Sequence, residues 1–382
     1  MTRIPAPKDE AELAAVVRDS SEPFRLEGLG TKGALGNPVA ASQVLSLRNF
    51  AGVVVYEPDE LILEAGSATP LKQLEKTLSQ KGQMLAFEPP DFSSLLGAST
   101  SGSLGGIVAC GLSGPRRVRA GAARDHVLGF SGVTGEGVAI RAGARVVKNV
   151  TGYDLAKLAT GSYGTLVAMT SIIVKVLPKP ETEETVFLRG VDDATAMRLM
   201  SEAMQSPADV SAAAHLPGDG TYLRLDGIAP SVAARRDRLV KLMKRDAGVL
   251  GEKESAKLWT GIRDVKPFWS LTTSSIWRLS VAPTEGASIA AAIMQKLDAA
   301  HFYDWAGGLI WLAVANSEDG GESVIRSSFT SGHATLVRAP EAIRARVSAF
   351  TPQPAALAAL AARVKHSFDA RNRFNPGIMV RG

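Results

Sequence analysis

The sequence has little cysteine and few aromatic residues. Its 382 residues include one cysteine, Cys110, so no disulfide can form within the chain, and a disulfide-stabilised scaffold is excluded. A single cysteine fits a reducing compartment. Aromatic residues make up 6% of the chain, and all five tryptophans lie between residues 259 and 311. The second half of the chain is therefore built differently from the first.

Long apolar runs and a strong charge excess are also missing. No apolar segment reaches the roughly 18 residues that a membrane-spanning helix needs. Acidic residues at Asp9, Glu10 and Glu12 stand where a signal peptide would need an apolar core. The net charge is only +5, and basic and acidic residues interleave outside residues 116–124, which argues against a nucleic-acid partner. We expect a cytoplasmic protein.

The sequence lacks the motifs of several enzyme classes. The five histidines occur singly, with no H-x-H, no H-E-x-x-H and no cysteine pair, so we expect no metal site. The nucleophile motif G-x-S-x-G and the phosphate loop G-x-x-x-x-G-K-[ST] are absent, which leaves hydrolase and NTPase interpretations without support.

Glycine, in contrast, is abundant and unevenly distributed. The chain has 37 glycines, and 22 of them lie between Gly28 and Gly164, including those of GLGTKG, SLGGIVACGLSG and GSYGTL. A backbone without Cβ atoms can approach a ligand closely and turn its N–H groups toward it. The first motif spells G-x-G-x-x-G, but Gly33, Gly36 and Pro38 break the helix that a Rossmann site requires. We predict instead several backbone loops along one extended, anionic cofactor.

Periodicity predicts the main elements of the first half. Residues 7–20 are expected to form a helix, and residues 52–66 and 126–143 two hairpins. Thr69 is expected to cap a helix that has Pro70 at its first position and ends before Gly82. Residues 164–178 form a long apolar segment that predicts a strand.

The second half predicts alternating strands and helices. Residues 178–185 are rich in proline and acidic residues, and we place a domain boundary near them. The following order, β-α-β-β-α-β, predicts one antiparallel sheet with helices on one face. An alanine-rich helix is expected over residues 354–371.

Several motifs in one order carry a resemblance to a known family. GLGTKG, SLGGIVACGLSGPRR, KNVTGYDLAKLATGSYGTL and the closing FNPGIM resemble the FAD-binding domain of the vanillyl-alcohol-oxidase type, also called the PCMH type. Within it, the combination of FEPP, IVACGLSGPRR and KNVTGYDL is most similar to the FAD-binding subunits of bacterial glycolate oxidases. The likeness covers residues 20–180 and continues more weakly to the end.

The resemblance implies an α+β fold in three parts. Residues 1–180 would form a PCMH-type FAD-binding domain of two α+β subdomains. Residues 181–350 would form an α+β cap domain with an antiparallel sheet, facing substrate or partner. Residues 351–382 would supply a C-terminal helix and the NPG segment that returns to the flavin.

The resemblance also implies which residues hold FAD. GLGTK would wrap the pyrophosphate, Asp125, His126 and Val127 would lie near the adenine, and Asn375 would return to the flavin ring. We expect non-covalent FAD, because Cys110 lies outside the family's attachment motif and no histidine occupies an attachment position. The cofactor-binding residues implied are Gly28, Leu29, Gly30, Thr31, Lys32, Pro89, Gly105, Gly106, Ala109, Cys110, Gly111, Ser113, Gly114, Asp125, Val127, Gly161, Ser162, Gly164, Leu166 and Asn375.

The function implied is that of an FAD-dependent 2-hydroxy-acid oxidoreductase subunit. Glycolate would be oxidised to glyoxylate, with electrons passed through FAD to partners: a catalytic FAD-binding glycolate oxidase subunit and an iron–sulfur subunit. Contact with the inner face of the membrane would be peripheral and through these partners.

Two departures from the family pattern keep an alternative open. SGHATL, with His333, stands where catalytic relatives carry G-D-G-N-x-H, and Tyr163 replaces the acid of G-S-E-G-T-L. No catalytic residue is assigned. The alternative is an accessory flavoprotein or scaffold subunit without its own catalytic site.

The arginines leave further alternatives. Arg116, Arg117 and Arg119 could bind cofactor phosphates, a substrate carboxylate or an acidic partner, or form a solvated basic loop. Arg278 could clamp a carboxylate through its planar guanidinium or pair with an acid of the chain.

Overall fold

The computed structural model describes residues 1–145 and 152–381, and these divide into two compact units. The first unit comprises residues 1–113, 121–179 and 352–382, and the second comprises residues 114–120 and 180–351. The C-terminal segment therefore belongs to the same unit as the N-terminus, and residues 114–120 pack with the second unit. Residues 148–151 of the KNVTGYDL motif lie outside the described residues.

The first unit begins with a small parallel sheet covered by one helix. Its strands β1 (Thr2–Arg3), β3 (Gln43–Ser46) and β2 (Phe24–Glu27) lie in that order. The predicted first helix is confirmed as α1 (Glu10–Asp19), and the Asp9 side chain caps it. Its buried face packs on the sheet through a shared core: Leu13, Ala14, Val17, Phe24, Leu45, Leu47 and Phe374.

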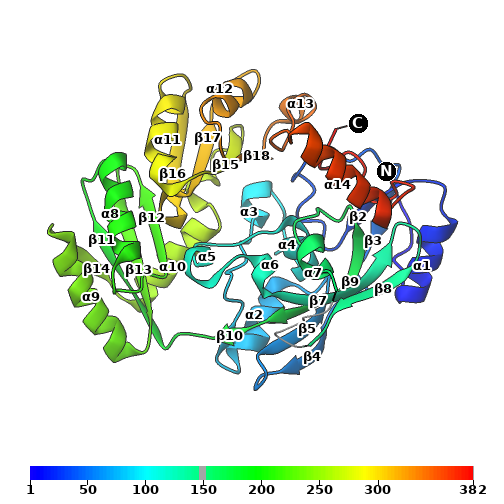
Figure 1. Ribbon diagram of the computed structural model, residues 1–382, viewed down its shortest axis with the longest axis horizontal. Helices are drawn as coiled ribbons and strands as arrows, with labels where there is room; N and C mark the ends of the chain where they lie inside the picture. The colour runs from blue at the N-terminus through cyan, green and yellow to red at the C-terminus, as the bar shows by residue number, and fades with distance from the viewer. Residues whose placement is uncertain (146–151, 382) are drawn as a thin grey trace. The chain divides into compact units, whose positions relative to one another are not determined.

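The first unit also contains a five-stranded antiparallel sheet, in the order β4-β5-β9-β7-β8 (Figure 1). Both predicted hairpins are confirmed, because β4 pairs with β5 and β7 pairs with β8. The predicted long strand is confirmed as β9, the central strand of the sheet. The bounds are β4 Val53–Glu57, β5 Ile62–Gly66, β7 Val127–Thr134, β8 Ala139–Gly143 and β9 Val167–Lys175.

Short helices connect these strands. One longer helix comes after the second unit in the sequence but belongs to the first unit. Strands β6 and β10 form a separate two-stranded antiparallel sheet. The predicted C-terminal helix is confirmed as α14. The bounds are α2 Leu71–Ser79, β6 Gln83–Met84, α3 Ser93–Leu96, α4 Leu104–Cys110, α6 Ala123–His126, α7 Leu155–Ala159, β10 Leu177–Pro178 and α14 Ala355–Phe368.

The predicted start of α2 is wrong by one residue. Pro70, not Thr69, precedes the helix, and its backbone is extended (φ −61°, ψ 137°). The Thr69 hydroxyl is used elsewhere, because it donates to the carbonyl of Gly66 (2.6 Å) and accepts the N–H of Gly52 (2.9 Å). Thr69 therefore ties the end of β5 to the start of β4, and does not cap the helix.

The second unit contains an eight-stranded antiparallel sheet in the order β14-β11-β13-β12-β16-β17-β15-β18. The predicted β-α-β-β-α-β order is confirmed by β11, α8, β12, β13, α9 and β14. The strands are β11 Thr182–Leu188, β12 Ala212–Leu216, β13 Gly220–Gly227, β14 Gly248–Leu250, β15 Ser275–Ser280, β16 Ala299–Asp304, β17 Leu309–Val314 and β18 His333–Arg338. The helices are α5 Arg117–Ala120, α8 Asp193–Gln205, α9 Ala229–Met243, α10 Glu252–Arg263, α11 Gly286–Met294, α12 Glu322–Ser327 and α13 Glu341–Arg344.

The prediction that helices cover one face of this sheet is wrong. Val186 and Leu188 of β11 join a core with residues of α8, α9 and α11. Thr185 directly precedes Val186 on β11 and points to the opposite face, because side chains alternate along a strand. There its hydroxyl accepts a hydrogen bond from Trp259 of α10 (2.8 Å). Helix α10 therefore covers the other face of the strand.

A carboxylate in the second unit joins one helix to two strands. Asp193, the first residue of α8, accepts hydrogen bonds from His301 (2.7 Å) and Tyr303 (2.6 Å) of β16 and contacts His215 of β12 (3.3 Å). Burial alone would raise the pKa of Asp193, but these hydrogen bonds outweigh it and hold the pKa far below its usual range. Asp193 therefore stabilises the fold as a carboxylate.

We expect Asp193→Asn to lower the free energy of unfolding at pH 7 by about 1–3 kcal/mol, because the charged acceptor of three donors is lost. A depressed folded-state pKa gives stability that is full above the unfolded value of about 4 and is lost as pH falls below it. The difference between the proteins should therefore shrink below about pH 4. Urea unfolding at pH 7 and pH 3.5 measures this, and a constant difference would contradict it.

Candidate functional site

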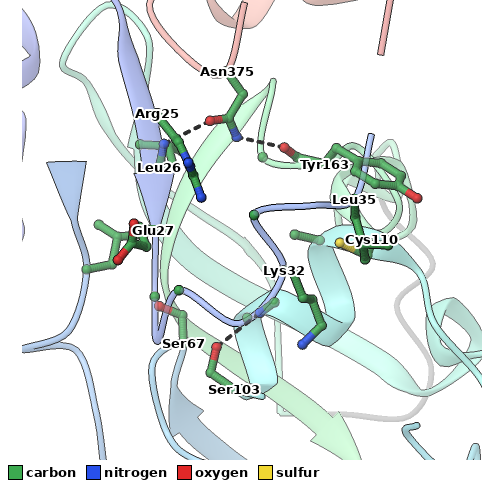
Figure 2. A pocket seen from close by; sticks show the side chains of 18 of the residues that line it. Arg25, Leu26, Glu27, Lys32, Leu35, Ser67, Ser103, Cys110, Tyr163 and Asn375 are labelled. Atoms are coloured by element: carbon green, nitrogen blue, oxygen red, sulfur yellow. Dashed lines mark hydrogen bonds between the residues drawn. The ribbon is translucent and has the colours of Figure 1, made fainter. Parts of the chain in front are cut away.

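The first unit contains a pocket formed by segments that are far apart in sequence. The end of β2 and the following loop form one side, α4 forms another, and the GSYGTL loop and the C-terminal segment complete it (Figure 2). Of the residues predicted to bind the cofactor, eleven line this pocket: Gly28, Leu29, Gly30, Thr31, Lys32, Gly105, Gly106, Ala109, Cys110, Gly164 and Asn375.

The GLGTKG loop offers its backbone to the pocket. In the described part of the chain, none of the six N–H groups from Gly28 to Gly33 donates a hydrogen bond to another residue. No helix starts after Gly33, so the structure agrees with the rejection of a Rossmann site. Gly30 has φ +74°, a left-handed conformation that glycine adopts without strain. Such a run of unpaired amides suits a ligand with many anionic oxygens.

Polar side chains beside this loop also favour an anionic ligand. Arg25 lines the pocket, and among the described residues its guanidinium forms no ion pair. Burial lowers the pKa of Lys32, while nearby Cys110 and Asp91 raise it. The Ser67 hydroxyl is buried and finds no hydrogen-bond partner in the described chain. Cations, free amides and a free hydroxyl together make this part of the pocket a binding site for an anion.

Helix α4 contributes close packing more than free donors. The N–H groups of Leu104, Gly105 and Gly106 already donate to Thr69, Ser67 and the Ser103 hydroxyl. A Cβ at Gly105 would lie 2.8 Å from both Cβ and O of Ser67. Glycine at this position therefore allows α4 to approach the turn that ends β5, and brings Ser67 and Ser103 to one end of the pocket in Figure 2.

The Asn375 side chain connects three segments of the pocket (Figure 2). Its Oδ1 accepts the N–H of Leu26 on β2, and its Nδ2 donates to the carbonyl of Tyr163, each at 2.8 Å. Its own N–H donates to Phe24 (2.9 Å). Both polar atoms of the amide are therefore engaged within the protein, and they hold β2, the GSYGTL loop and the C-terminal segment together.

Cys110 lines the pocket as a protonated thiol. Burial raises its pKa to about 11, although nearby Lys32 lowers it. The nucleophilic form of cysteine is the thiolate, so this residue is unreactive near neutral pH.

The other nine predicted residues do not line the pocket. Ser113 and Asp125 satisfy backbone N–H groups of Ala123 and Ala122 at the start of α6 (both 2.8 Å). Gly114 lies in the second unit, where its carbonyl accepts a hydrogen bond from Trp305. The remaining six are buried or half-buried residues outside the pocket lining: Pro89, Gly111, Val127, Gly161, Ser162 and Leu166.

Packing explains two of these glycines. The N–H groups of Gly161 and Tyr163 donate to the carbonyls of Val108 and Ala109 at the end of α4 (3.0 and 2.7 Å). A Cβ at Gly111 would lie 3.2 Å from the Cα of Gly161. These glycines bring the GSYGTL loop against α4, next to the pocket wall.

The arginine cluster is occupied within the second unit. Arg116 is buried and pairs with Asp226, and Arg119 pairs with Asp209 (2.7 Å). Arg117 and Arg278 both lie over the ring of Trp305, at 4.2 and 4.8 Å from its centroid. The interpretation as a solvated basic loop is therefore wrong for Arg116. His333 is exposed at the start of β18.

Sequence reasoning missed Arg25, Ser67, Ser103 and the pocket-lining role of Tyr163. Ser103 carries a signal, since its side chain precedes a short helix and caps it at Gly106. Arg25 and Ser67 carry none, because a strand arginine and a serine after a strand are common in any fold.

Two absences apply to the described residues. Across residues 1–145 and 152–381, no group of three or more His, Cys, Asp or Glu side chains is arranged to hold a metal ion. Within the same ranges, no helix has both the length and the apolar character needed to cross a bilayer.

We expect Gly164→Ala to destabilise the protein more than Gly161→Ala. Both residues have left-handed backbones (φ +67° and +84°), which cost an alanine about 1–2 kcal/mol. Only at Gly164 would the new Cβ meet the Asn375 amide, at 2.9 Å, and disturb its two hydrogen bonds. Those bonds add about 1–2 kcal/mol to the difference. Urea unfolding of both variants measures it, and equal destabilisation would show that the amide is not a constraint.

Comparison with known proteins identifies the family of the chain. Residues 2–143 match the FAD binding domain family. The chain is 35% identical over 358 residues to the glycolate oxidase subunit GlcE of Escherichia coli, covering 94% of this chain and 92% of that protein. It is 28% identical to the glycolate oxidase subunit GlcD of Bacillus subtilis, over 69% of this chain but only 51% of that protein.

Solved structures show the same fold. p-Cresol methylhydroxylase aligns with 99% of this chain and 88% of its own, with a TM-score of 0.73 at 12% identity. Alkyldihydroxyacetonephosphate synthase aligns with 98% of this chain and 75% of its own, with a TM-score of 0.69 at 15% identity. The predicted α+β fold of the PCMH type is confirmed. The chain belongs to the family of the glycolate oxidase subunit GlcE and carries its FAD binding domain.

Proposed function

We propose that this chain is the FAD-binding subunit of a glycolate (2-hydroxy-acid) oxidase complex that converts glycolate to glyoxylate. The observation that carries the proposal is the pocket of the first unit, with its free GLGTKG amides, Arg25, Lys32 and Ser67. Similarity to GlcE over 94% of the chain supports the same assignment.

The residues of the pocket fit the chemistry of FAD. The amides of Gly28–Gly33, with Arg25 and Lys32, would hold the diphosphate, because amide dipoles and cations stabilise its charges. Ser67, buried and without a partner, would gain one from the bound cofactor. When bound, FAD supplies the redox chemistry, while the protein supplies orientation and electrostatics. Cys110 remains a thiol, which supports a non-covalent complex.

One observation favours the second candidate, an accessory flavoprotein without its own catalytic site. The pocket lining contains no histidine, and its one carboxylate, Glu27, forms an ion pair with Arg3 (2.9 Å). The lining described for the first unit therefore offers neither a histidine nor an unpaired carboxylate as a base for a substrate proton. In this case a partner subunit oxidises the substrate, and this chain passes electrons onward.

Partners follow from the same proposal. GlcE and GlcD are both named as glycolate oxidase subunits. We propose a catalytic FAD-binding subunit and an iron–sulfur subunit as partners. This chain has one cysteine, so it cannot itself supply four cysteine ligands to a cluster. We also propose a cytoplasmic location, with any membrane contact made through the partners.

The flavin spectrum of the purified chain tests the proposal. We expect a yellow protein whose flavin is released completely on denaturation. Reduction by glycolate of the isolated chain would support a self-sufficient subunit, and reduction only with the partner subunits would support the accessory one. A colourless chain that does not take up added FAD would contradict both.

Lys32→Met tests the assigned diphosphate contact. We expect it to weaken FAD binding about tenfold, because a charged hydrogen bond to the anion is lost. The control is Lys76→Met, which changes an exposed lysine of α2. Fluorescence titration of both apoproteins gives the dissociation constants. Equal affinity in the two variants would remove Lys32 from the site.

A further inference from the structure

Lys365 joins three separate pieces of the first unit. It lies on α14 and does not line the pocket. Its ammonium donates to the carbonyl of Thr165 (2.7 Å) at the end of the GSYGTL loop and to that of Phe374 (3.2 Å). It also pairs with Asp369 one helical turn on. One cation therefore connects α14, the loop and the residue that precedes Asn375.

Asp369 fixes the other end of this connection. Its carboxylate is buried and accepts the N–H groups of Arg373 (2.7 Å) and Phe374 (2.8 Å). The chain from the end of α14 to Asn375 is therefore folded around one carboxylate, which also holds the ammonium of Lys365. Burial lowers the pKa of Lys365, while the hydrogen bond and charge of Asp369 raise it.

The GSYGTL loop needs such support. Gly161, Tyr163 and Gly164 all have positive φ (84°, 54° and 67°), and a tyrosine adopts this conformation only at a cost. Strained backbones persist where the surroundings determine them in several ways. Helix α4 holds one side of the loop, through the carbonyls of Val108 and Ala109. Lys365 holds its far end.

The two segments that Lys365 bonds, the GSYGTL loop and the C-terminal segment, both contain residues that line the pocket. Tyr163 and Gly164 line the pocket just before Thr165, and Asn375 lines it just after Phe374. The Asn375 amide then bonds Tyr163 and Leu26. Lys365 and Asn375 therefore both connect the GSYGTL loop to the C-terminal segment, Lys365 through Thr165 and Phe374, and Asn375 through Tyr163.

We propose that Lys365 is a positioning residue for the cofactor pocket, which holds the GSYGTL loop and the NPG turn in the arrangement that binds FAD. The inference rests on the proposed function, since it assigns FAD to this pocket. A purely structural role would lower stability alone. A positioning role also lowers FAD affinity under conditions where the variant is folded.

Arg371 provides a matched control on the same segment. Its guanidinium donates to the carbonyls of Val17, Arg18 and Gly135 (3.1–3.4 Å) and pairs with Glu136 (3.2 Å). None of these partners lines the pocket. Arg371→Met therefore removes a comparable set of bonds without touching the GSYGTL loop.

The experiment compares Lys365→Met with Arg371→Met in the full chain. Urea unfolding of the apoproteins gives stability, and fluorescence titration with FAD, at a temperature where both are folded, gives affinity. We expect both variants to lose stability, but only Lys365→Met to bind FAD about tenfold more weakly. The visible circular dichroism of bound flavin should change in the same variant only. Lys365→Arg, which keeps the charge and donors, should recover most of the affinity.

Each outcome separates the inference from the proposed function. Equal FAD affinity in Lys365→Met and wild type, or an equal loss in both variants, would overturn the positioning role while leaving FAD binding established. A wild-type chain that binds no FAD would overturn the proposed function itself. If Lys365→Met does not fold, Lys365→Gln, which keeps one donor group, enters the same titration with the same two outcomes.

Discussion

The amide of Asn375 is the interaction on which the pocket depends. It bonds Leu26 at the end of β2 and Tyr163 in the GSYGTL loop, two residues separated by more than a hundred positions in the chain. The GLGTKG loop leaves β2 immediately after this point, so its direction is set by the same strand. Glycine at position 164 is required because a Cβ would meet the amide. A single side chain thus fixes where three backbone segments can lie.

The pocket contains two kinds of polar groups, those bonded within the protein and those available to a ligand. The Asn375 amide and the N–H groups of Gly161, Ser162, Tyr163 and Thr165 are bonded within the protein. The GLGTKG amides, Arg25 and Ser67 remain available to a ligand in the part of the chain that the structure describes. The first set gives shape and the second gives affinity for an anion. Nothing in this arrangement requires the chain to carry the catalytic base, which is consistent with a subunit that works beside others.

The sequence predicted the loops better than the side chains around them. The glycine motifs, both hairpins, β9 and α14 follow from local rules, because left-handed turns, alternation and helical periodicity leave a record in neighbouring residues. Arg25 and Ser67 could not be found this way, since what matters is that the fold leaves them without partners. Arg116 is the opposite case. The sequence shows it in a basic cluster open to a ligand, but in the fold it pairs with Asp226, which is far away in the sequence. The prediction that helices cover only one face of the second sheet is wrong for a similar reason. Only the contact between Trp259 and Thr185 shows which face helix α10 covers.

The central claim is that the GLGTKG backbone holds the anionic part of FAD, and hydrogen–deuterium exchange of residues 28–33 tests it most directly. These amides have no acceptor in the described chain, so they should exchange rapidly in the apoprotein. The account predicts that FAD slows their exchange strongly, while the amides of β9, already paired in the sheet, change little. FAD binding that leaves residues 28–33 unprotected would contradict it.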